Sequence, residues 1–334
     1  MPPDITTDID AAVERLHAGG LVAIPTETVY GLAALADLPA AVAAVFQLKG
    51  RPSSHPLIVH VGAPDWVRQW ARDPPPGALR LMDAFWPGPL ALVLDALPTV
   101  SRDITAGQDT VALRMPDHPV CLELLRRLNR AVVAPSANRF TQVSPTRAAH
   151  VAQQFPDSDL LILDGGPCRV GVESTIVALC QDTDAARLEP DLLEPDLLKP
   201  ELLRPGMIAV DALATVLGAP LLHADSSTIR APGQHRRHYA PRTPAWTFTD
   251  RLPCSPEDTR IGWIFCGNRF ATAGPALDLG PDPAAYAAGL YAALHALDAA
   301  NLRGIAVAQP PDGPEWRAVH DRLRRATGHE SLLM

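Results

Sequence analysis

The chain has 334 residues, of which 47% are hydrophobic, and its formal net charge is −8. A chain of this length and apolar content can bury a full core and is long enough for two domains, which excludes a disordered or fibrous protein. The negative charge argues against a protein that grips nucleic acid through a wide basic face, because such binding scales with the number of phosphates neutralised.

Cysteine usage and the first residues indicate the compartment. The five cysteines form no CxxC pair, which predicts neither a disulfide framework nor a zinc knuckle and fits a reducing cytoplasm. The N-terminus carries acids where a signal peptide needs a basic and then an apolar run, and no segment reaches about 18 uninterrupted apolar residues. We therefore expect a soluble, unexported, cytoplasmic protein without membrane contact.

The apolar spacing predicts helices and strands that alternate along the first two thirds of the chain. Helices are expected at 8–18, 39–49, 63–72, 77–85, 118–128, 145–154 and 208–218. Strands are expected at 21–25, 57–61, 90–94, 110–115, 131–135, 160–164 and 174–179. This alternation predicts an α/β fold with a sheet of mixed pairing.

The last third of the chain begins with two irregular stretches. Residues 188–206 hold three near-copies of a five-residue unit with a proline in each, which we interpret as a low-complexity loop expansion without function. The pattern restarts after 245, with strands expected at 246–249, 261–267 and 304–309 and helices at 283–302 and 314–327. The sequence thus predicts a first domain of residues 1–215, a linker of residues 216–244 and a smaller C-terminal α/β domain of residues 245–334.

Three clusters of small polar residues lie beside predicted strands. They are residues 25–32 (PTETVYGL), residues 134–138 (APSAN) with 144–146 (SPT), and residues 171–176 (GVESTI) with Arg204 downstream. Open α/β sheets place ligands at strand ends, so we expect these clusters, together with the turn that holds Lys49 and Arg51, to form one pocket. Each is a weak signal alone, since Ser and Asn are common in turns and the first cluster also suits a helix N-cap with a capping Glu.

Lys49 and Arg51 flank a glycine, with His55 shortly after. Only two of the 29 basic residues are lysines, so a lysine at this place is an exception. A Lys as point charge and an Arg as a two-pronged donor suggest a phosphate clamp. A solvated helix end is the alternative.

Arg114 interrupts the otherwise apolar run TVALRMP, where an unpaired charge facing the core would be costly. It requires an anion, either a structural Asp or Glu or the carboxylate of a substrate, and the sequence leaves both open. The chain contains no GxxxxGK[ST], GxGxxG, HExxH or GxSxG motif, which disfavours the standard nucleotide loops and covalent hydrolases. His235 and His238 have no further ligand types nearby, so no metal site is expected.

The ordered motifs resemble the threonylcarbamoyl-AMP synthases, in the two-domain type that joins a YrdC-like catalytic domain to a C-terminal domain. The resemblance spans about residues 15 to 242 and ends more loosely at RLRRATG. It rests on PTETVYGL, KGRP with HPLIVHV, FWPGPLALVL, TAGQDTVALRMPDHP, APSAN with SPT, GVESTI, RPG and APGQHRRHYAP. A string of motifs in this order is highly specific where any one alone is not.

The resemblance implies a fold and a reaction. The fold would be a YrdC-like twisted mixed sheet with a deep electropositive cavity, plus a smaller Rossmann-like C-terminal α/β domain. The enzyme, a nucleotidyltransferase, would convert L-threonine, bicarbonate or CO2, and ATP to threonylcarbamoyl-AMP and pyrophosphate, for threonylcarbamoyladenosine in tRNA. Mg²⁺ would accompany the triphosphate, bound mainly through phosphate oxygens and water.

The resemblance also implies roles for particular residues. Threonine would be held by Thr28, His60, Arg114, Ala134 and Ser174. ATP would be surrounded by Lys49, Arg51, His55, Thr110, Ser136, Asn138, Ser144 and Arg204, with Lys49 and Arg51 as the catalytic pair on its phosphates. Arg237, His238 and Tyr239 would belong to a lid formed by the linker.

The implied partners are the proteins that transfer the threonylcarbamoyl group to tRNA, with tRNA itself contacted weakly or indirectly. Two rival functions remain open. One is a YrdC-like module that binds RNA directly, double-stranded RNA included, against which the net charge weighs. The other is a domain that handles carbamoyl-adenylate, as occurs within larger carbamoyltransferases and hydrogenase-maturation proteins.

Overall fold

The computed structural model describes residues 2–180, 200–223, 228–233, 235, 237–250 and 252–327. In this part of the chain one sheet contains β1 (Asp4–Thr6), β2 (Val22–Ile24), β3 (Gly31–Leu35), β4 (Ile58–His60), β5 (Leu90–Asp95), β6 (Thr110–Arg114), β7 (Val132–Val133), β8 (Leu161–Leu163), β9 (Thr175–Ala178), β10 (Glu201–Arg204) and β11 (Leu222–His223). Its strand order is β1-β8-β2-β3-β7-β4-β6-β5-β9-β10-β11, with parallel and antiparallel pairs mixed. The strands β4, β6 and β7 therefore lie near its middle.

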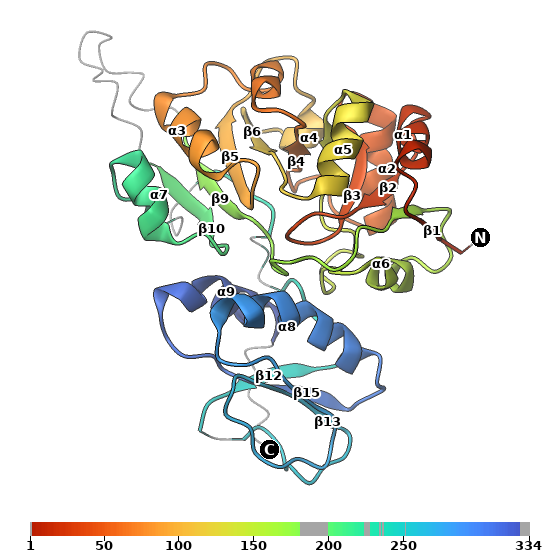
Figure 1. Cartoon of the computed structure of the whole chain (residues 1–334), viewed down its shortest axis with the longest axis vertical. Coiled ribbons are helices and arrows are strands. Elements are labelled where there is room, and N and C mark those ends of the chain that lie inside the picture. Colours follow the sequence, from red (N-terminus) through yellow and green to blue (C-terminus); the bar gives the residue numbers. More distant parts are fainter. Residues whose placement is uncertain are drawn as a thin grey trace.

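Helices cover both faces of this first sheet (Figure 1). They are α1 (Ile9–His17), α2 (Pro39–Lys49), the 3-10 helix η1 (Pro64–Gln69), α3 (Pro76–Phe85), α4 (Arg102–Thr105), α5 (Pro119–Leu128), α6 (Ala148–Gln154) and α7 (Val210–Leu217). Helix α1 begins where the Asp8 carboxylate accepts hydrogen bonds from two backbone N–H groups of the first turn. Helix α2 has a proline at its start and ends at Gly50, whose φ of 63° suits a left-handed helix end.

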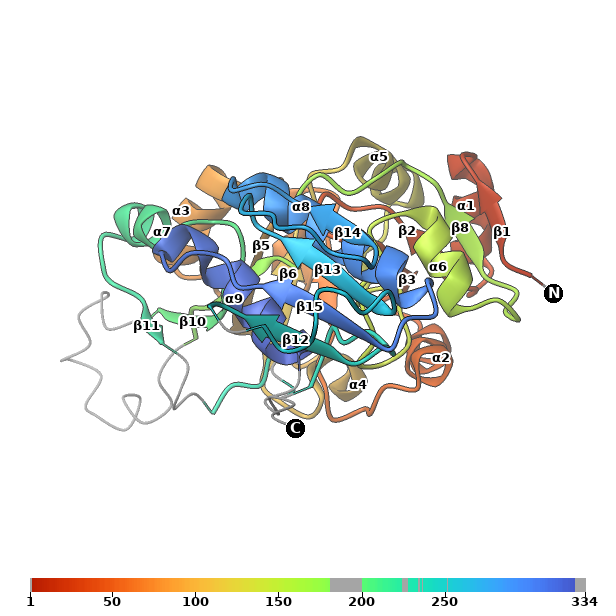
Figure 2. The ribbon, with the colours of Figure 1, turned by 90° about the horizontal axis from the view of Figure 1, so that it is seen from below.

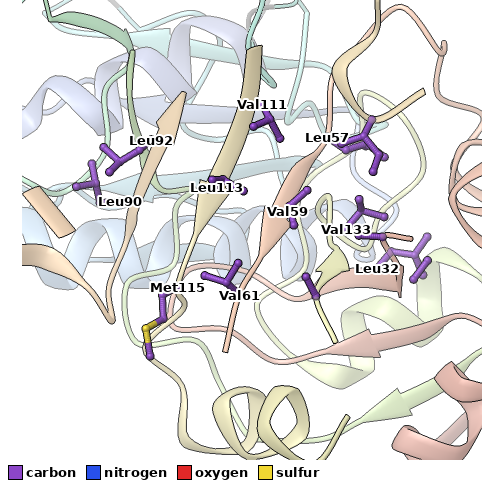
Figure 3. Close-up of a cluster of buried hydrophobic side chains, with 14 of the residues drawn as sticks. Leu32, Leu57, Val59, Val61, Leu90, Leu92, Val111, Leu113, Met115 and Val133 are labelled. Carbon is purple, nitrogen blue, oxygen red and sulfur yellow. The ribbon is translucent and has the colours of Figure 1, made fainter. Parts of the chain in front are cut away.

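The largest apolar cluster lies on one face of the sheet. Figure 3 shows part of it, with Val59 of β4, Leu92 of β5, Leu113 of β6 and Val133 of β7 side by side. Helices α2 and α3 contribute apolar side chains to the same cluster, while α1 and α5 pack against the opposite face. Burial on both faces holds the central strands, and with them the residues at their ends, in fixed positions.

The second sheet is smaller and wholly parallel. It contains β12 (Ala245–Phe248), β13 (Ile261–Phe265), β14 (Ala276–Asp278) and β15 (Gly304–Ala308), in the order β12-β15-β13-β14. The accompanying helices are α8 (Pro283–Asp298), η5 (Pro314–Trp316) and α9 (Arg317–Ala326). Figure 1 shows α8 and α9 between this sheet and the first domain, and Figure 2 views the molecule from the side of the second sheet.

The two domains share one apolar cluster. Val29, Val143 and Val172 from the first domain pack together with Tyr286 and Leu290 of α8. Gly171 lies so close to α8 that a Cβ atom there would come within 2.4 Å of the Ala288 backbone. The second domain is therefore docked on the loop that leads into β9.

The predicted α/β class, with a mixed first sheet and a smaller second α/β domain, is confirmed. Two local predictions were wrong, and some elements were not predicted. The helix expected at 63–72 is the 3-10 helix η1, and the segment 201–204, expected to be part of a loop, is strand β10, because it pairs with β9. Strand β3 was not predicted, since its small residues GLAAL lack the β-branched side chains typical of strands.

Two other expectations are not tested. The repeat before residue 200 lies outside the described residues. The domain boundaries at 215 and 244 stay a prediction, although strand β11 extends the first sheet to His223.

In the part of the chain that the structure describes, no helix is long and apolar enough to cross a membrane.

The close approach at Gly171 predicts a sensitive position. Gly171 and Gly166 have similar φ angles, 78° and 83°, but nothing lies within 4 Å of a Cβ atom at Gly166. Gly166→Ala should therefore lower the free energy of unfolding only by the backbone strain, about 1 to 2 kcal/mol. Gly171→Ala should lower the midpoint of thermal unfolding at least about twice as much as Gly166→Ala does, because the new methyl group also pushes α8 away. Equal midpoints for the two variants would contradict this docking.

Candidate active site

One cavity lies against the middle of the first sheet and encloses about 500 Å³, its open mouth included. The three polar clusters and the segment after Lys49 all contribute to its wall. The wall consists of Thr28, Val29, Arg51, Pro56, Leu57, Ile58, His60, Arg114, Ala134, Pro135, Ser136, Glu173, Ser174, Arg204, Pro232, Gly233, His238 and Tyr239. Residues more than 200 positions apart in the sequence thus meet in one hollow.

Arg114, at the end of β6, is buried and has an internal acid beside it. Its Nη2 atom lies 2.7 Å from Oε1 of Glu27, which is fully buried. The same Nη2 donates a hydrogen bond to Oγ1 of Thr28 at 2.9 Å, and the Glu27 oxygens take part in no hydrogen bond with described residues. Both anions that the sequence left open are therefore compatible with Arg114, because it pairs with Glu27 and still lines the cavity.

His60 lies next to Arg114 in the paired strand β4. Burial, and next the positive charge of Arg114, lower the pKa of His60 to about 3. Its Nδ1 lies 3.3 Å from the carbonyl oxygen of Ile58. The imidazole is consequently neutral near pH 7, so it adds a polar group to the cavity without adding charge.

Lys49 and Arg51 are not a solvated helix end, because both are buried. Lys49 Nζ donates hydrogen bonds to the carbonyl oxygens of Ser136 and Asn138, the latter at 2.6 Å. Arg51 Nη2 donates to the carbonyl oxygen of Pro56 at 3.0 Å. Burial, and next the charge of Arg51, hold the pKa of Lys49 well below its usual value, while burial lowers the pKa of Arg51 to about 10. Burial thus disfavours the charged forms of both side chains, and a bound anion would stabilise these charged forms.

Arg204 connects three parts of the wall. It donates from Nε to the carbonyl oxygen of Ser174 and from Nη2 to Oγ of Ser174, both at 3.0 Å. Its Nη1 donates to the carbonyl oxygen of Pro232 in the linker at 3.1 Å. Strand β10, the GVESTI segment and the linker are therefore fastened together at the cavity.

The linker segment also contributes to the wall of the cavity, through Pro232, Gly233, His238 and Tyr239. His238 and Tyr239 are buried in its wall, and Tyr239 adopts a left-handed backbone with φ of 59°. Three buried polar atoms of wall residues have no hydrogen-bond partner among the described residues, namely Arg51 Nε, His238 Nδ1 and Tyr239 OH. Unpaired buried polar atoms on a cavity wall are what a polar ligand would satisfy.

Glu173 places a second acid in the wall. Its Oε1 accepts a hydrogen bond from Ser144 Oγ at 2.6 Å, and its Oε2 accepts from Tyr291 OH at 3.0 Å and from Arg322 Nε at 2.7 Å. Tyr291 lies in α8 and Arg322 in α9. The second domain thus reaches the cavity through the Glu173 carboxylate.

The structure brings together Thr28, His60, Arg114, Ala134, Ser174, Arg51, Ser136, Arg204, His238 and Tyr239 in the wall of the cavity. The wall residues identified in the described part of the chain do not include Lys49, His55, Thr110, Asn138, Ser144 or Arg237. Of these, Lys49 and Ser144 bond to wall residues, and His55 packs on Phe140 with ring centres 5.4 Å apart. Thr110 lies at the start of β6, and Arg237 is exposed.

Sequence reasoning assigned no site role to Glu27, which it considered only as a capping Glu, or to Glu173. It also missed Arg322 of the second domain, the partner of Glu173. Arg322 carried a readable signal, because it shares one face of α9 with the buried Val319, Leu323 and Ala326. A charge at that spacing on an apolar face calls for a buried partner.

Two known protein families match the chain. The family Sua5_yciO_yrdC, described as Telomere recombination, matches residues 14–188. The family Sua5_C, described as the C-terminal domain of threonylcarbamoyl-AMP synthase, matches residues 208–328. The chain belongs to the threonylcarbamoyl-AMP synthase family.

Individual members of this family are similar over nearly their whole length. Threonylcarbamoyl-AMP synthase of Pyrococcus abyssi is 36% identical over 97% of this chain and 95% of its own, and that of Bacillus subtilis is 35% identical over 96% and 93%. A crystal structure of P. abyssi Sua5 complexed with L-threonine matches with a TM-score of 0.82 and 34% identity, over 98% of this chain and 97% of that one. The family resemblance predicted from the motifs is therefore confirmed.

A metal centre is not formed by the described residues, among which no group of three or more His, Cys, Asp or Glu side chains could hold an ion. His235 and His238 instead pack around the ring of Phe140, with ring centres 5.8 and 5.9 Å from it.

The Arg114–Glu27 pair predicts a coupled effect on stability. Arg114→Met should lower the free energy of unfolding by about 3 to 5 kcal/mol, because it leaves the Glu27 charge buried and unpaired. Combining Arg114→Met with Glu27→Gln should recover at least half of this loss. Urea denaturation measures both values. A double variant no more stable than Arg114→Met alone would contradict the pairing.

Proposed function

We propose that this chain is an L-threonylcarbamoyladenylate synthase, which makes threonylcarbamoyl-AMP and pyrophosphate from L-threonine, bicarbonate or CO2, and ATP. The observation that carries the proposal is a single cavity where buried cations and unpaired polar atoms converge. Membership of the family and the likeness to a threonine complex of P. abyssi Sua5 support it.

The chemistry needs no covalent enzyme intermediate. The deprotonated amine of threonine attacks CO2 and forms a C–N bond, releasing one proton and leaving a carbamate. A carbamate oxygen then attacks the α-phosphorus of ATP, and the bond to the β-phosphate breaks so that pyrophosphate leaves with its electrons. The protein's task is to hold two anions together and to stabilise charge, which suits a site with more cations and hydroxyls than nucleophiles.

We assign threonine to the part of the cavity around Arg114. The guanidinium would bind the carboxylate of threonine while Glu27 holds it from the far side, and Thr28 and Ser174 would supply hydroxyls. The backbone at Ala134 lies in the same wall. The neutral His60 would contact an uncharged part of the threonine molecule, because a neutral imidazole can form a hydrogen bond without attracting a competing anion.

We assign ATP to the part around Arg51, as a nucleotidyltransferase requires. Arg51 and Lys49 would act on the phosphates, and Ser136 and Arg204 would lie beside the nucleotide. His55, Thr110, Asn138 and Ser144 would act from outside the wall described above, and Mg²⁺ would enter with the triphosphate on phosphate oxygens and water. The linker residues Arg237, His238 and Tyr239 would form a lid that retains the nucleotide.

We further propose a cytoplasmic protein that passes its product to the proteins that transfer threonylcarbamoyl groups to tRNA. Contact with tRNA would be weak or indirect, since the net charge is −8 and a broad phosphate-binding face is not expected.

The proposed function predicts threonine-dependent release of pyrophosphate. With ATP and bicarbonate present, release should rise strongly on addition of L-threonine, and mass spectrometry should detect threonylcarbamoyl-AMP. Arg51→Gln should lose at least about 100-fold in rate, because it removes a preorganised charge at the phosphates. Arg126→Gln, which changes an exposed arginine of α5, is the matched control and should keep the full rate. Release that is independent of threonine would instead favour a carbamoyl-adenylate domain, and steeply salt-dependent retention of tRNA an RNA-binding module.

The depressed pKa of Lys49 predicts proton uptake when ATP binds. A bound triphosphate supplies the opposite charge and raises the pKa of Lys49 toward its usual value, so the complex binds more protons than the free protein. Burial also lowers the pKa of Arg51, to about 10, so the wild type must be compared with a variant that changes Lys49 alone. Calorimetry in buffers of different ionisation enthalpy should show uptake in the wild type and less in Lys49→Arg, whose guanidinium keeps its proton more firmly. Equal uptake in both proteins would contradict the role of Lys49.

A further inference from the structure

Glu173 is an acid in the wall of a cavity that we assign to two anionic substrates. The residue is 6% exposed and lines the same hollow as Arg51 and Arg204. A carboxylate in this position repels phosphates and carboxylates alike, and the low-dielectric surroundings strengthen the repulsion. The site therefore needs a device that neutralises this charge and turns it away from the ligands.

The contacts of the carboxylate supply such a device, and it comes from the other domain. Arg322 of α9 is fully buried and donates from Nε to Oε2 of Glu173 at 2.7 Å. Its Nη2 donates to the carbonyl oxygen of Glu173 at 3.1 Å and its Nη1 to that of Pro205 at 3.0 Å. With Ser144 on Oε1 and Tyr291 on Oε2, both carboxylate oxygens are hydrogen-bonded by protein groups.

The charges around Arg322 balance only when Glu173 of the first domain is included, because the second domain supplies two arginines and one acid. Arg322 Nη1 also lies 2.7 Å from Oδ2 of Asp321, and Asp321 in turn pairs with Arg325 at 2.9 Å. Burial would lower the pKa of Arg322, but Glu173, Tyr239 and Asp321 outweigh it and hold that pKa well above its usual value. The guanidinium is thus a permanent counter-ion.

The arrangement leaves other cations available to a ligand. Glu27 is paired with Arg114, and Glu173 with Arg322. Within the described ranges neither Arg51 nor Arg204 forms an ion pair with an acid. Arg204 donates to Ser174, the neighbour of Glu173, so without Arg322 it would be a nearby cation toward which the freed carboxylate could turn.

We propose that Arg322 is a positioning residue of the active site, supplied by the second domain, which neutralises Glu173 and holds its carboxylate away from the bound phosphates. The inference rests on the proposed function, because it assumes anions in the cavity. It assigns the second domain an electrostatic part in substrate binding, in addition to covering the GVESTI segment. A purely structural Arg322 would only fasten the two domains.

Charged and uncharged ligands separate these two roles. Dissociation constants of the full-length chain for ATP and for adenosine, measured by calorimetry, are compared in the wild type, Arg322→Gln, Glu173→Gln and the double variant. Arg322→Gln should weaken the binding of ATP at least about 10-fold and that of adenosine by less than about 3-fold, because only the phosphates of ATP are repelled by the unneutralised carboxylate of Glu173. The double variant should bind ATP within about 3-fold of Glu173→Gln, since the acid is then gone.

Arg324→Gln is the matched control, because Arg324 is an exposed arginine on the same helix. It should leave the ratio of ATP to adenosine affinity unchanged, and thermal unfolding checks that each variant is folded. If Arg322→Gln does not fold, the comparison of the double variant with Glu173→Gln still decides. A double variant as weak for ATP as Arg322→Gln, or equal losses for ATP and adenosine, would overturn the proposal.

Pyrophosphate serves as a second probe that keeps this test independent of the proposed function. Wild-type protein that binds ATP no better than adenosine would contradict the synthase assignment. If the cavity is an anion site in which Glu173 must be neutralised, Arg322→Gln should still bind pyrophosphate more weakly than the wild type, and the double variant should bind it about as tightly as Glu173→Gln. No difference between variants for pyrophosphate would overturn the role of Arg322 itself.

Discussion

The structure around the cavity depends on one constraint, which is that a site for anions must carry buried positive charge and yet remain folded without its ligands. Buried cations are costly unless they are paired, and a cation that is fully paired has little attraction left for a substrate. In the described part of this chain, one buried cation of the cavity is paired with an acid, and others are not. Arg114 contacts the carboxylate of Glu27 without hydrogen-bond geometry, whereas the bonds that the Arg51 and Lys49 side chains donate to described residues go to neutral carbonyl oxygens.

This constraint also explains why the second domain is docked where it is. The loop into β9 carries Glu173, and the helices α8 and α9 cover that loop with apolar side chains and with Arg322. Arg204 ties the same loop to Pro232 of the linker. A change in the docking of the second domain would therefore alter the cavity in three ways. It would change the Glu173–Arg322 ion pair, the Arg204–Pro232 hydrogen bond and the apolar packing on the loop into β9.

Much of this architecture could be predicted from the sequence, because it depends on local patterns. Helix α2 was predicted with its exact bounds, since a proline starts it and a glycine ends it. The polar clusters were expected to meet, and Thr28, Ser136 and Ser174 do lie in one wall, because strand ends next to each other bring their loops together.

The remainder depends on tertiary contacts that no local pattern encodes. Strand β3 has no β-branched residue and is a strand because β2 and β7 pair with it on both sides. The partner of Arg114 could not be chosen from the sequence, since Glu27 is 87 positions away. Likewise, Glu173 and Arg322 come from different domains, and their pairing needs the docked arrangement.

The central claim is that one hollow holds an amino acid beside a triphosphate. Crystals of this protein grown with L-threonine and a non-hydrolysable ATP analogue test it most directly. The account predicts the threonine carboxylate on Arg114, with Glu27 still in contact on the far side, and the phosphates beside Arg51 in the same cavity. Threonine bound away from Arg114, or the nucleotide bound elsewhere on the surface, would contradict it.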